Sequence, residues 1–104
     1  MSVAEGAPRD QTVLEARVRI PQHVVHRSFV KETVVLNLNT GRYHGVNPTG
    51  GRMLTTLEEV GSVREAAARL AREYDQPLEQ IERDLCEFCE ALSERGLIEL
   101  EPAA

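Results

Sequence analysis

The sequence is poor in several residue types that mark particular classes of protein. It has 104 residues, with two cysteines, no tryptophan, two tyrosines and two phenylalanines. Two cysteines cannot provide the disulfide framework of a small secreted domain. No apolar run exceeds four residues, so no segment could span a membrane, and no basic start followed by an apolar stretch marks a secretion signal. We therefore expect one cytoplasmic domain.

The charge is acidic overall and unevenly distributed. The chain has 17 acidic and 12 basic residues, a formal net charge of −5, and such a chain is a poor candidate for binding a phosphate backbone. Residues 1–52 carry seven bases and four acids, whereas residues 53–104 carry five bases and 13 acids. One interpretation is a helical second half with a glutamate-rich exposed face. The other is a cleft with one basic and one acidic wall, which would suit a peptide of mixed charge.

The first half of the chain predicts an arm followed by strands. Residues 1–16 show no periodicity, so we expect a mobile arm there and place the folded domain at residues 17–104. Residues 33–38 alternate, with Val34, Leu36 and Leu38 on one face. A turn signal at residues 39–41 follows, and residues 42–46 return as a short strand. This part of the chain therefore predicts a β-meander.

Three helices are predicted in the second half. Asn47 suits an N-cap and Pro48 the first position of the first helix, which ends at Gly61. Residues 62–65 form a capping box for the second helix. The third helix begins at residue 77 or 78 and ends at Gly96, and Leu97, Ile98 and Leu100 form a tail that can lie on the core. The apolar stripe of the third helix consists of Leu78, Ile81, Leu85, Phe88 and Leu92.

These elements predict an α+β, winged-helix-like fold. An N-terminal three-stranded antiparallel sheet precedes three helices, whereas in the usual order the ribbon follows them. The element count keeps a winged-helix nucleic-acid binder as an alternative. However, the predicted third helix carries six acidic residues against two basic ones, and such a helix would repel phosphates.

A search for reactive residues finds no catalytic constellation. Cys86 and Cys89 form a C-x-x-C motif, but it lies more than two turns inside a predicted helix, away from the N-terminus that would lower a thiol pKa. Both are better interpreted as small buried residues, with a redox role as the alternative. A zinc site would need two more ligands, and His23, His26 and His44 give no ligand pattern. We predict a protein that is not an enzyme and needs no metal or cofactor.

The last predicted strand is the remaining candidate for a functional site. One side of residues 42–46 is unpaired unless another element covers it, and such an edge recruits strands. Gly45 leaves room beside the backbone. If the third helix packs alongside, edge and helix form a groove suited to β-augmentation by a peptide. Asp84, one position before the core residue Leu85, would border this groove and could meet a basic partner.

The stretch from Val34 to Gly50, VVLNLNTGRYHGVNPTG, resembles the signature of PqqD-like proteins. That signature is an apolar strand, a polar turn with glycine, an aromatic strand, and then an apolar residue and asparagine before a small-residue helix start. The segments SVREAA at 62–67 and RGLI at 95–98 fit as well. The resemblance covers roughly residues 22–100 and departs from the family at residues 1–16 and at Val46, where leucine is more usual.

The resemblance implies a function in peptide recognition. PqqD-like proteins are recognition elements that bind the leader segment of a ribosomally made precursor as an added strand on the third strand, beside the third helix. They then present the precursor to a modifying enzyme. The wording NTGRYHGVNPT is most similar to stand-alone members from lasso-peptide clusters, whose partner is a leader peptidase. The alternative partner is the radical-SAM enzyme of quinone-cofactor biosynthesis.

The resemblance also implies a set of binding residues and no catalytic one. Transferred by position, the leader-binding residues are Arg42, Tyr43, His44, Gly45 and Val46 on the strand, with Ile81, Asp84, Leu85, Phe88 and Cys89 on the third helix. This set agrees with the groove that the edge and helix pattern predicts.

Overall fold

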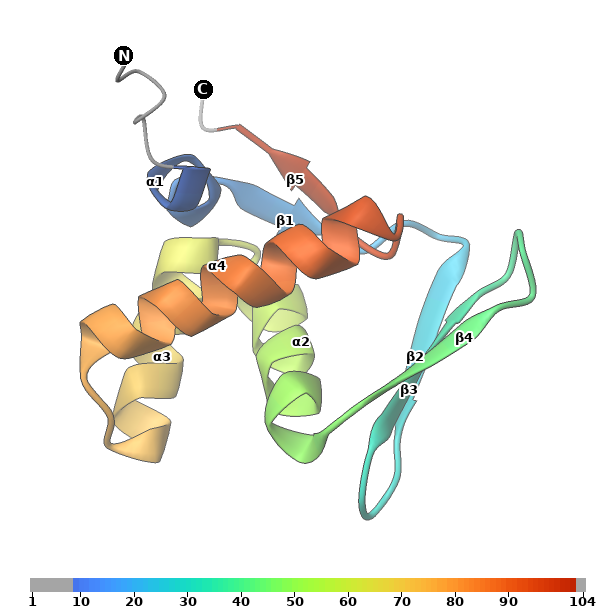
Figure 1. Ribbon diagram of the computed structural model, residues 1–104, viewed down its shortest axis with the longest axis horizontal. Coiled ribbons are helices and arrows are strands. Elements are labelled where there is room, and N and C mark those ends of the chain that lie inside the picture. Colours follow the sequence, from blue (N-terminus) through green and yellow to red (C-terminus); the bar gives the residue numbers. More distant parts are fainter. Residues whose placement is uncertain (1–8, 103–104) are drawn as a thin grey trace.

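The computed structural model describes residues 9–102, whose arrangement is shown in Figure 1. In chain order the elements are α1 (Arg9–Leu14), β1 (Arg17–Arg19), β2 (Val24–Ser28), β3 (Thr33–Asn37), β4 (Tyr43–Val46), α2 (Pro48–Val60), α3 (Val63–Tyr74), α4 (Leu78–Glu94) and β5 (Glu99–Glu101). The three predicted helices are α2, α3 and α4. The predicted α+β arrangement, in which a three-stranded antiparallel sheet precedes three helices, is confirmed.

The strands form two separate antiparallel sheets. In the meander the order is β2–β3–β4, with Leu36 opposite both Val25 and Tyr43. The second sheet pairs β1 with β5, and Val18 lies opposite Leu100. Figure 1 shows the meander extending to one side of the helices, while the β1–β5 pair lies on another side of α4. Residues 17–19 therefore join the two ends of the domain instead of belonging to the meander.

The helix boundaries follow the predicted caps. The Asn47 side chain accepts a hydrogen bond from the Gly50 N–H at 2.7 Å at the start of α2, and Gly61 ends this helix with a φ of 70°. The Ser62 hydroxyl accepts one from the Glu65 N–H at 3.2 Å at the start of α3. After α4, Gly96 takes a φ of 72°, a conformation that glycine adopts at little cost.

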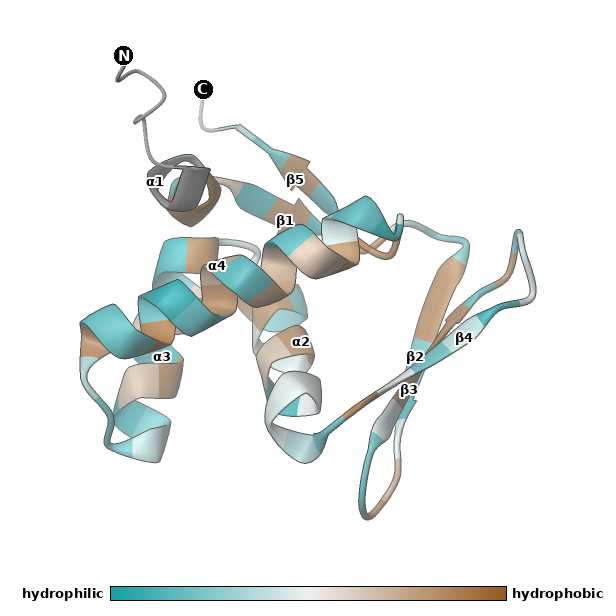
Figure 2. Cartoon of the chain, viewed as in Figure 1, coloured by the Kyte–Doolittle hydropathy of each residue, from teal (hydrophilic) through white to brown (hydrophobic). Residues whose placement is uncertain are grey.

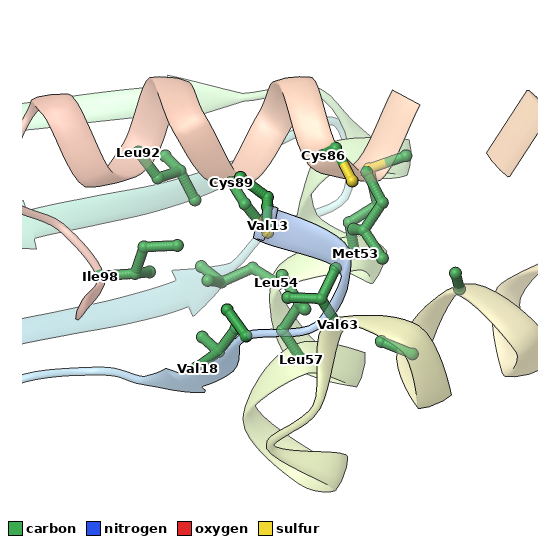
Figure 3. Close-up of a cluster of buried hydrophobic side chains, with 14 of the residues drawn as sticks. Val13, Val18, Met53, Leu54, Leu57, Val63, Cys86, Cys89, Leu92 and Ile98 are labelled. Atoms are coloured by element: carbon green, nitrogen blue, oxygen red, sulfur yellow. The ribbon is translucent and has the colours of Figure 1, made fainter. Parts of the chain in front are cut away.

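The core lies between the helices and the β1–β5 pair. Figure 3 shows part of it, with Leu54 and Leu57 of α2 facing side chains from α4 and from both ends of the domain. Ala66 and Ala67 of α3 are completely buried, so this helix packs closely against its neighbours. Leu97 and Ile98 are also buried, so the C-terminal tail lies on the core as predicted. The meander joins this core through one face only.

The buried face of β3 carries Thr33 and Val35, which are 3% and 1% exposed. A glycine of α2, Gly51, packs against the Thr33 side chain and fixes this choice of face. Val34, Leu36 and Leu38 do share one face, as the alternation predicts, but that face points away from the helices. Figure 2 shows apolar colour along β2 too, on a strand that no helix covers in this view.

The N-terminal segment and the predicted stripe position Leu78 differ from expectation. Residues 1–8 of the predicted arm lie outside the described residues, but residues 9–14 form α1, which contacts α4 and buries Val13. Tyr74 and Leu78 are 38% and 45% exposed, because they stand at the last turn of α3 and the first turn of α4, where the packing ends. Within residues 9–102, no helix combines the length and the apolar character needed to cross a bilayer.

Candidate functional site

The strand β4 forms an edge of the meander, and its hydrogen bonding identifies the groups that face outward. The Asn37 N–H donates to the Arg42 carbonyl at 2.9 Å. Because bonded and non-bonded pairs alternate along an antiparallel ladder, the even-numbered residues of β4 bond to β3. Tyr43 and Gly45 then direct their N–H and C=O groups to the open edge. These two residues offer the main-chain positions for an added strand.

A cavity of about 600 Å³ opens beside this edge. It lies between the end of β4, the first turns of α2 and the middle of α4. Its lining residues are Gly45, Val46, Asn47, Thr49, Gly50, Met53, Asp84, Glu87 and Phe88. Because Gly45 belongs both to the open edge and to this lining, a strand added to β4 would lie along the cavity. The groove that the sequence predicts between the last strand and the third helix is thus present.

A second cavity of about 260 Å³ adjoins the first. The two share Thr49, Met53 and Asp84, and the second continues toward α3, where Leu70 and Tyr74 contribute to its wall. Asp84 therefore stands where the two cavities meet. We call the two cavities together the cleft.

Local sequence brings the walls of the cleft together. Asn47 and Pro48 turn the chain directly from the edge strand into α2, so the end of β4 and the first turn of α2 are neighbours. A Cβ placed on Gly50 would lie 3.3 Å from Cε1 of Phe88. This glycine therefore allows the aromatic ring of α4 to approach α2 closely.

The charged side chains that line the cleft are acidic. Asp84 and Glu87 lie on one side of α4, one turn apart. Among the described residues no basic side chain lines either cavity. The interpretation of a cleft with one basic and one acidic wall is therefore wrong for its basic half. Three bases of the first half of the chain lie on other surfaces, since Arg17 and Arg19 lie on β1 and Arg52 pairs with α3.

The ion pairs lie elsewhere on the surface. Arg52 of α2 and Glu73 of α3 form a two-pronged pair with N–O distances of 2.8–3.1 Å. The hydrogen bonds of this pair raise the pKa of Arg52 and lower the pKa of Glu73. By contrast, Asp84 receives only a long hydrogen bond of 3.4 Å from the Gln80 amide. Asp84 and Glu87 form no salt bridge with any residue in the range 9–102.

The structure brings part of the predicted site together. Gly45, Val46, Asp84 and Phe88 line the first cavity, and Ile81 lines the second. Three other predicted residues, Arg42, Tyr43 and His44, belong to the same edge segment but do not line a cavity. Tyr43 is 72% exposed on the face of the sheet that points away from the helices.

Two predicted residues, Leu85 and Cys89, are completely buried beneath the wall of the cleft. Both belong to the core cluster against which Phe88 packs, and they offer no surface to a ligand. In the first cavity, the residues that sequence reasoning missed are Asn47, Thr49, Gly50, Met53 and Glu87. The signal for four of them was the immediate passage from an edge strand into a helix, which places the first turns of that helix beside the edge.

The cysteine pair lies in the core. Cys86 and Cys89 are 1% and 0% exposed, and both are thiols. Burial, helped by the neighbouring Cys86, raises the pKa of Cys89 to about 12. A thiol with such a pKa is protonated at neutral pH and is a poor nucleophile. No group of three or more potential metal ligands occurs in the part of the chain that the structure describes.

Comparisons with known proteins agree with this geometry. The family model "Coenzyme PQQ synthesis protein D (PqqD)" matches residues 32–98. A solved structure titled "TbiB1 in Complex with the TbiA(beta) Leader Peptide" shares 34% identity, with a TM-score of 0.72 over 78% of this chain and 94% of that chain. A second, "Lasso peptide synthetase B1 complexed with the leader peptide", has the same fold, with 24% identity and a TM-score of 0.72 over 81% of this chain and 99% of that chain. No curated protein matches the chain. The family match covers more than half of the sequence, and the chain belongs to the PqqD family.

Proposed function

We propose that this protein is a non-catalytic leader-peptide recognition protein. It binds a ribosomal precursor peptide as an additional strand on β4, beside α4, and delivers it to a modifying enzyme. The observation that carries the proposal is the open edge at Tyr43 and Gly45 lying along a cavity of about 600 Å³. Main-chain hydrogen bonds would supply affinity and the cleft would supply side-chain specificity.

The similar TbiB1 structure supports this role, because that protein was solved with a leader peptide. It also favours a lasso-peptide cluster, in which the enzyme that receives the precursor is a leader peptidase. The alternative partner, a radical-SAM enzyme, is suggested by the name of the matching family model. The acidic wall of the cleft argues against the winged-helix nucleic-acid alternative, since a phosphate backbone would be repelled there.

The proposed binding residues fall into three groups. Tyr43 and Gly45 would pair through their main chains, and Val46, Asp84 and Phe88 would contact the side chains of the peptide. Ile81 would form the floor of the second cavity. Leu85 and Cys89 would act only from beneath, because both are buried. A leader held by two or three apolar side chains and main-chain bonds should reach about micromolar affinity, or about −8 kcal/mol.

The decisive test is the Gly45→Pro variant. The N–H of Gly45 faces the open edge, so proline removes a donor to the peptide without removing a bond to β3. A Cβ at this position would meet only the flexible end of the Glu32 side chain. We expect binding of the leader from the precursor encoded beside the gene to be lost while the fold is retained, as measured by calorimetry and amide NMR.

A matched control is the Gly45→Ala variant. It adds a methyl group at the same place but keeps the N–H, so it should bind the leader nearly as well as the wild type. Amide shifts in wild-type protein should fall on residues 42–46 and 78–92. Normal affinity in a folded Gly45→Pro variant would reject β4 as the docking edge.

A further inference from the structure

We propose that the cleft selects leader segments in which a lysine or arginine stands two residues from an apolar side chain. This inference rests on the proposed function and names the class of peptide that the same site takes. It follows from three observations: the direction in which an added strand would point its side chains, the apolar part of the cleft, and its carboxylates that lack a basic partner.

The register of the sheet fixes which peptide side chains enter the cleft. His44 and Val46 lie opposite Val35 and Thr33, the residues of the buried face of β3. A strand on the open edge would form bonded pairs with Tyr43 and Gly45, whose side-chain positions face away from the helices. The peptide residues across from His44 and Val46 would therefore face the helices. These two peptide positions are two residues apart.

The cleft offers an apolar surface for one of these two side chains. Val46, Met53 and Phe88 come together in the lining of the first cavity. Phe88 is partly exposed and packed against the core, and the close approach of Gly50 leaves its ring at the wall. An apolar peptide side chain placed here would remove hydrocarbon surface from water on both partners.

The same cavity offers negative charge for the other side chain. Asp84 and Glu87 are the charged residues in its lining, and neither forms a salt bridge with any described residue. A peptide that covers them with neutral side chains would desolvate both carboxylates without compensation. A lysine or arginine would compensate both, because its long side chain can follow the apolar wall and end at the charges.

A third carboxylate extends the preference to the other side of the edge. Oε1 of Glu32 lies 2.6 Å from the position that a Cβ of Gly45 would occupy. It therefore stands over the edge on the face that points away from the helices. An acidic peptide strand would meet like charge on both of its faces, so the cleft rejects acidic segments as well as attracting basic ones.

The experiment is a double-mutant cycle on the leader encoded beside the gene. Each lysine or arginine of the leader is replaced in turn by glutamine, and each peptide is titrated into wild type and into an Asp84→Asn/Glu87→Gln variant. One substitution, two positions from an apolar residue, should weaken binding to wild type by about fivefold to tenfold. The same substitution should have little effect on binding to the variant. Raising the salt concentration should reduce the wild-type preference.

The control is Glu94→Gln, which removes one negative charge from the same helix at an exposed position outside both cavities. It should leave the peptide preference unchanged. The inference is overturned if wild type binds the leader, the Gly45→Pro variant does not, and no lysine or arginine of the leader contributes. A leader that fails to bind wild type at all would instead overturn the proposed function, and this inference with it.

Discussion

The two sheets of this small domain use similar strands for opposite purposes. The β1–β5 pair joins residues 17–19 to residues 99–101 and turns Val18 toward the core. The meander has one face on the helices, one face with exposed apolar side chains, and an open edge beside the cleft. The pair closes the domain, whereas the meander presents a surface for a partner. The pair is tied to the core by Val18 and by Ile98 beside β5, whereas the meander is tied to it by Val24 and Val35 on one face only.

The largest effect on stability should come from a substitution beside the β1–β5 pair, which closes the domain. Ile98, next to β5, is 2% exposed, and Ile98→Ala should lower the free energy of unfolding by about 2–4 kcal/mol because it leaves a cavity in the core. The comparison is Leu38→Ala, at a residue directly after β3 that is 57% exposed, and it should cost less than about 0.5 kcal/mol. Urea unfolding of the two variants measures this difference. Similar losses would show that the exposed face of the meander also contributes to the stability of the fold.

An intermediate effect is expected where the meander is attached to α2. A Cβ on Gly51 would overlap the Thr33 side chain, whose Cβ would be only 2.9 Å away, so Gly51→Ala should cost about 1–3 kcal/mol. Gly50→Ala is the control, since its nearest contacts are at 3.3 Å and require only small shifts. It should lower thermal stability less but narrow the cleft. Equal melting temperatures for wild type and Gly51→Ala would contradict this account of the attachment.

The smallest effect concerns the ion pair of the closing sheet. Arg19 and Glu99 lie opposite each other on β1 and β5, and their side chains are 58% and 45% exposed. Because solvent screens such a pair, Glu99→Gln should reduce stability by at most about 0.5 kcal/mol. Thermal unfolding at low and high salt would detect the contribution as a small difference that salt removes. A large loss would mean that charge, and not burial, holds the closing pair together.

Local signals in the sequence predicted most of the elements. The turn before β4 follows from Asn37, whose side chain accepts from the N–H groups of Asn39 and Thr40, and from Gly41 with its φ of 75°. The caps of α2 and α3 could also be predicted, because each cap depends on residues within one helical turn. These signals also positioned the edge strand correctly.

The rest depends on contacts between distant parts of the chain. Each strand of the β1–β5 pair has three residues, too few for a visible alternation, and the partners are 80 to 84 positions apart. The alternation also could not predict which face of β3 is buried, since Val34, Leu36 and Leu38 are more apolar than Thr33. The contact between Thr33 and Gly51 decides it. The residues that line the cleft likewise could not be predicted without knowing that α2 lies beside α4, which brings Gly50 close to Phe88.

The carboxylate of Glu32 above Gly45 has a consequence for how copies of the protein meet. An exposed strand edge normally invites a second copy to pair with it, which leads to dimers or aggregates. Two β4 edges brought together would place two Glu32 side chains, and the acidic walls behind them, close to one another. Like charges across a strand pair are destabilising. We therefore expect these charges to disfavour pairing of the β4 edge with a second copy, while a basic peptide strand can still pair with it.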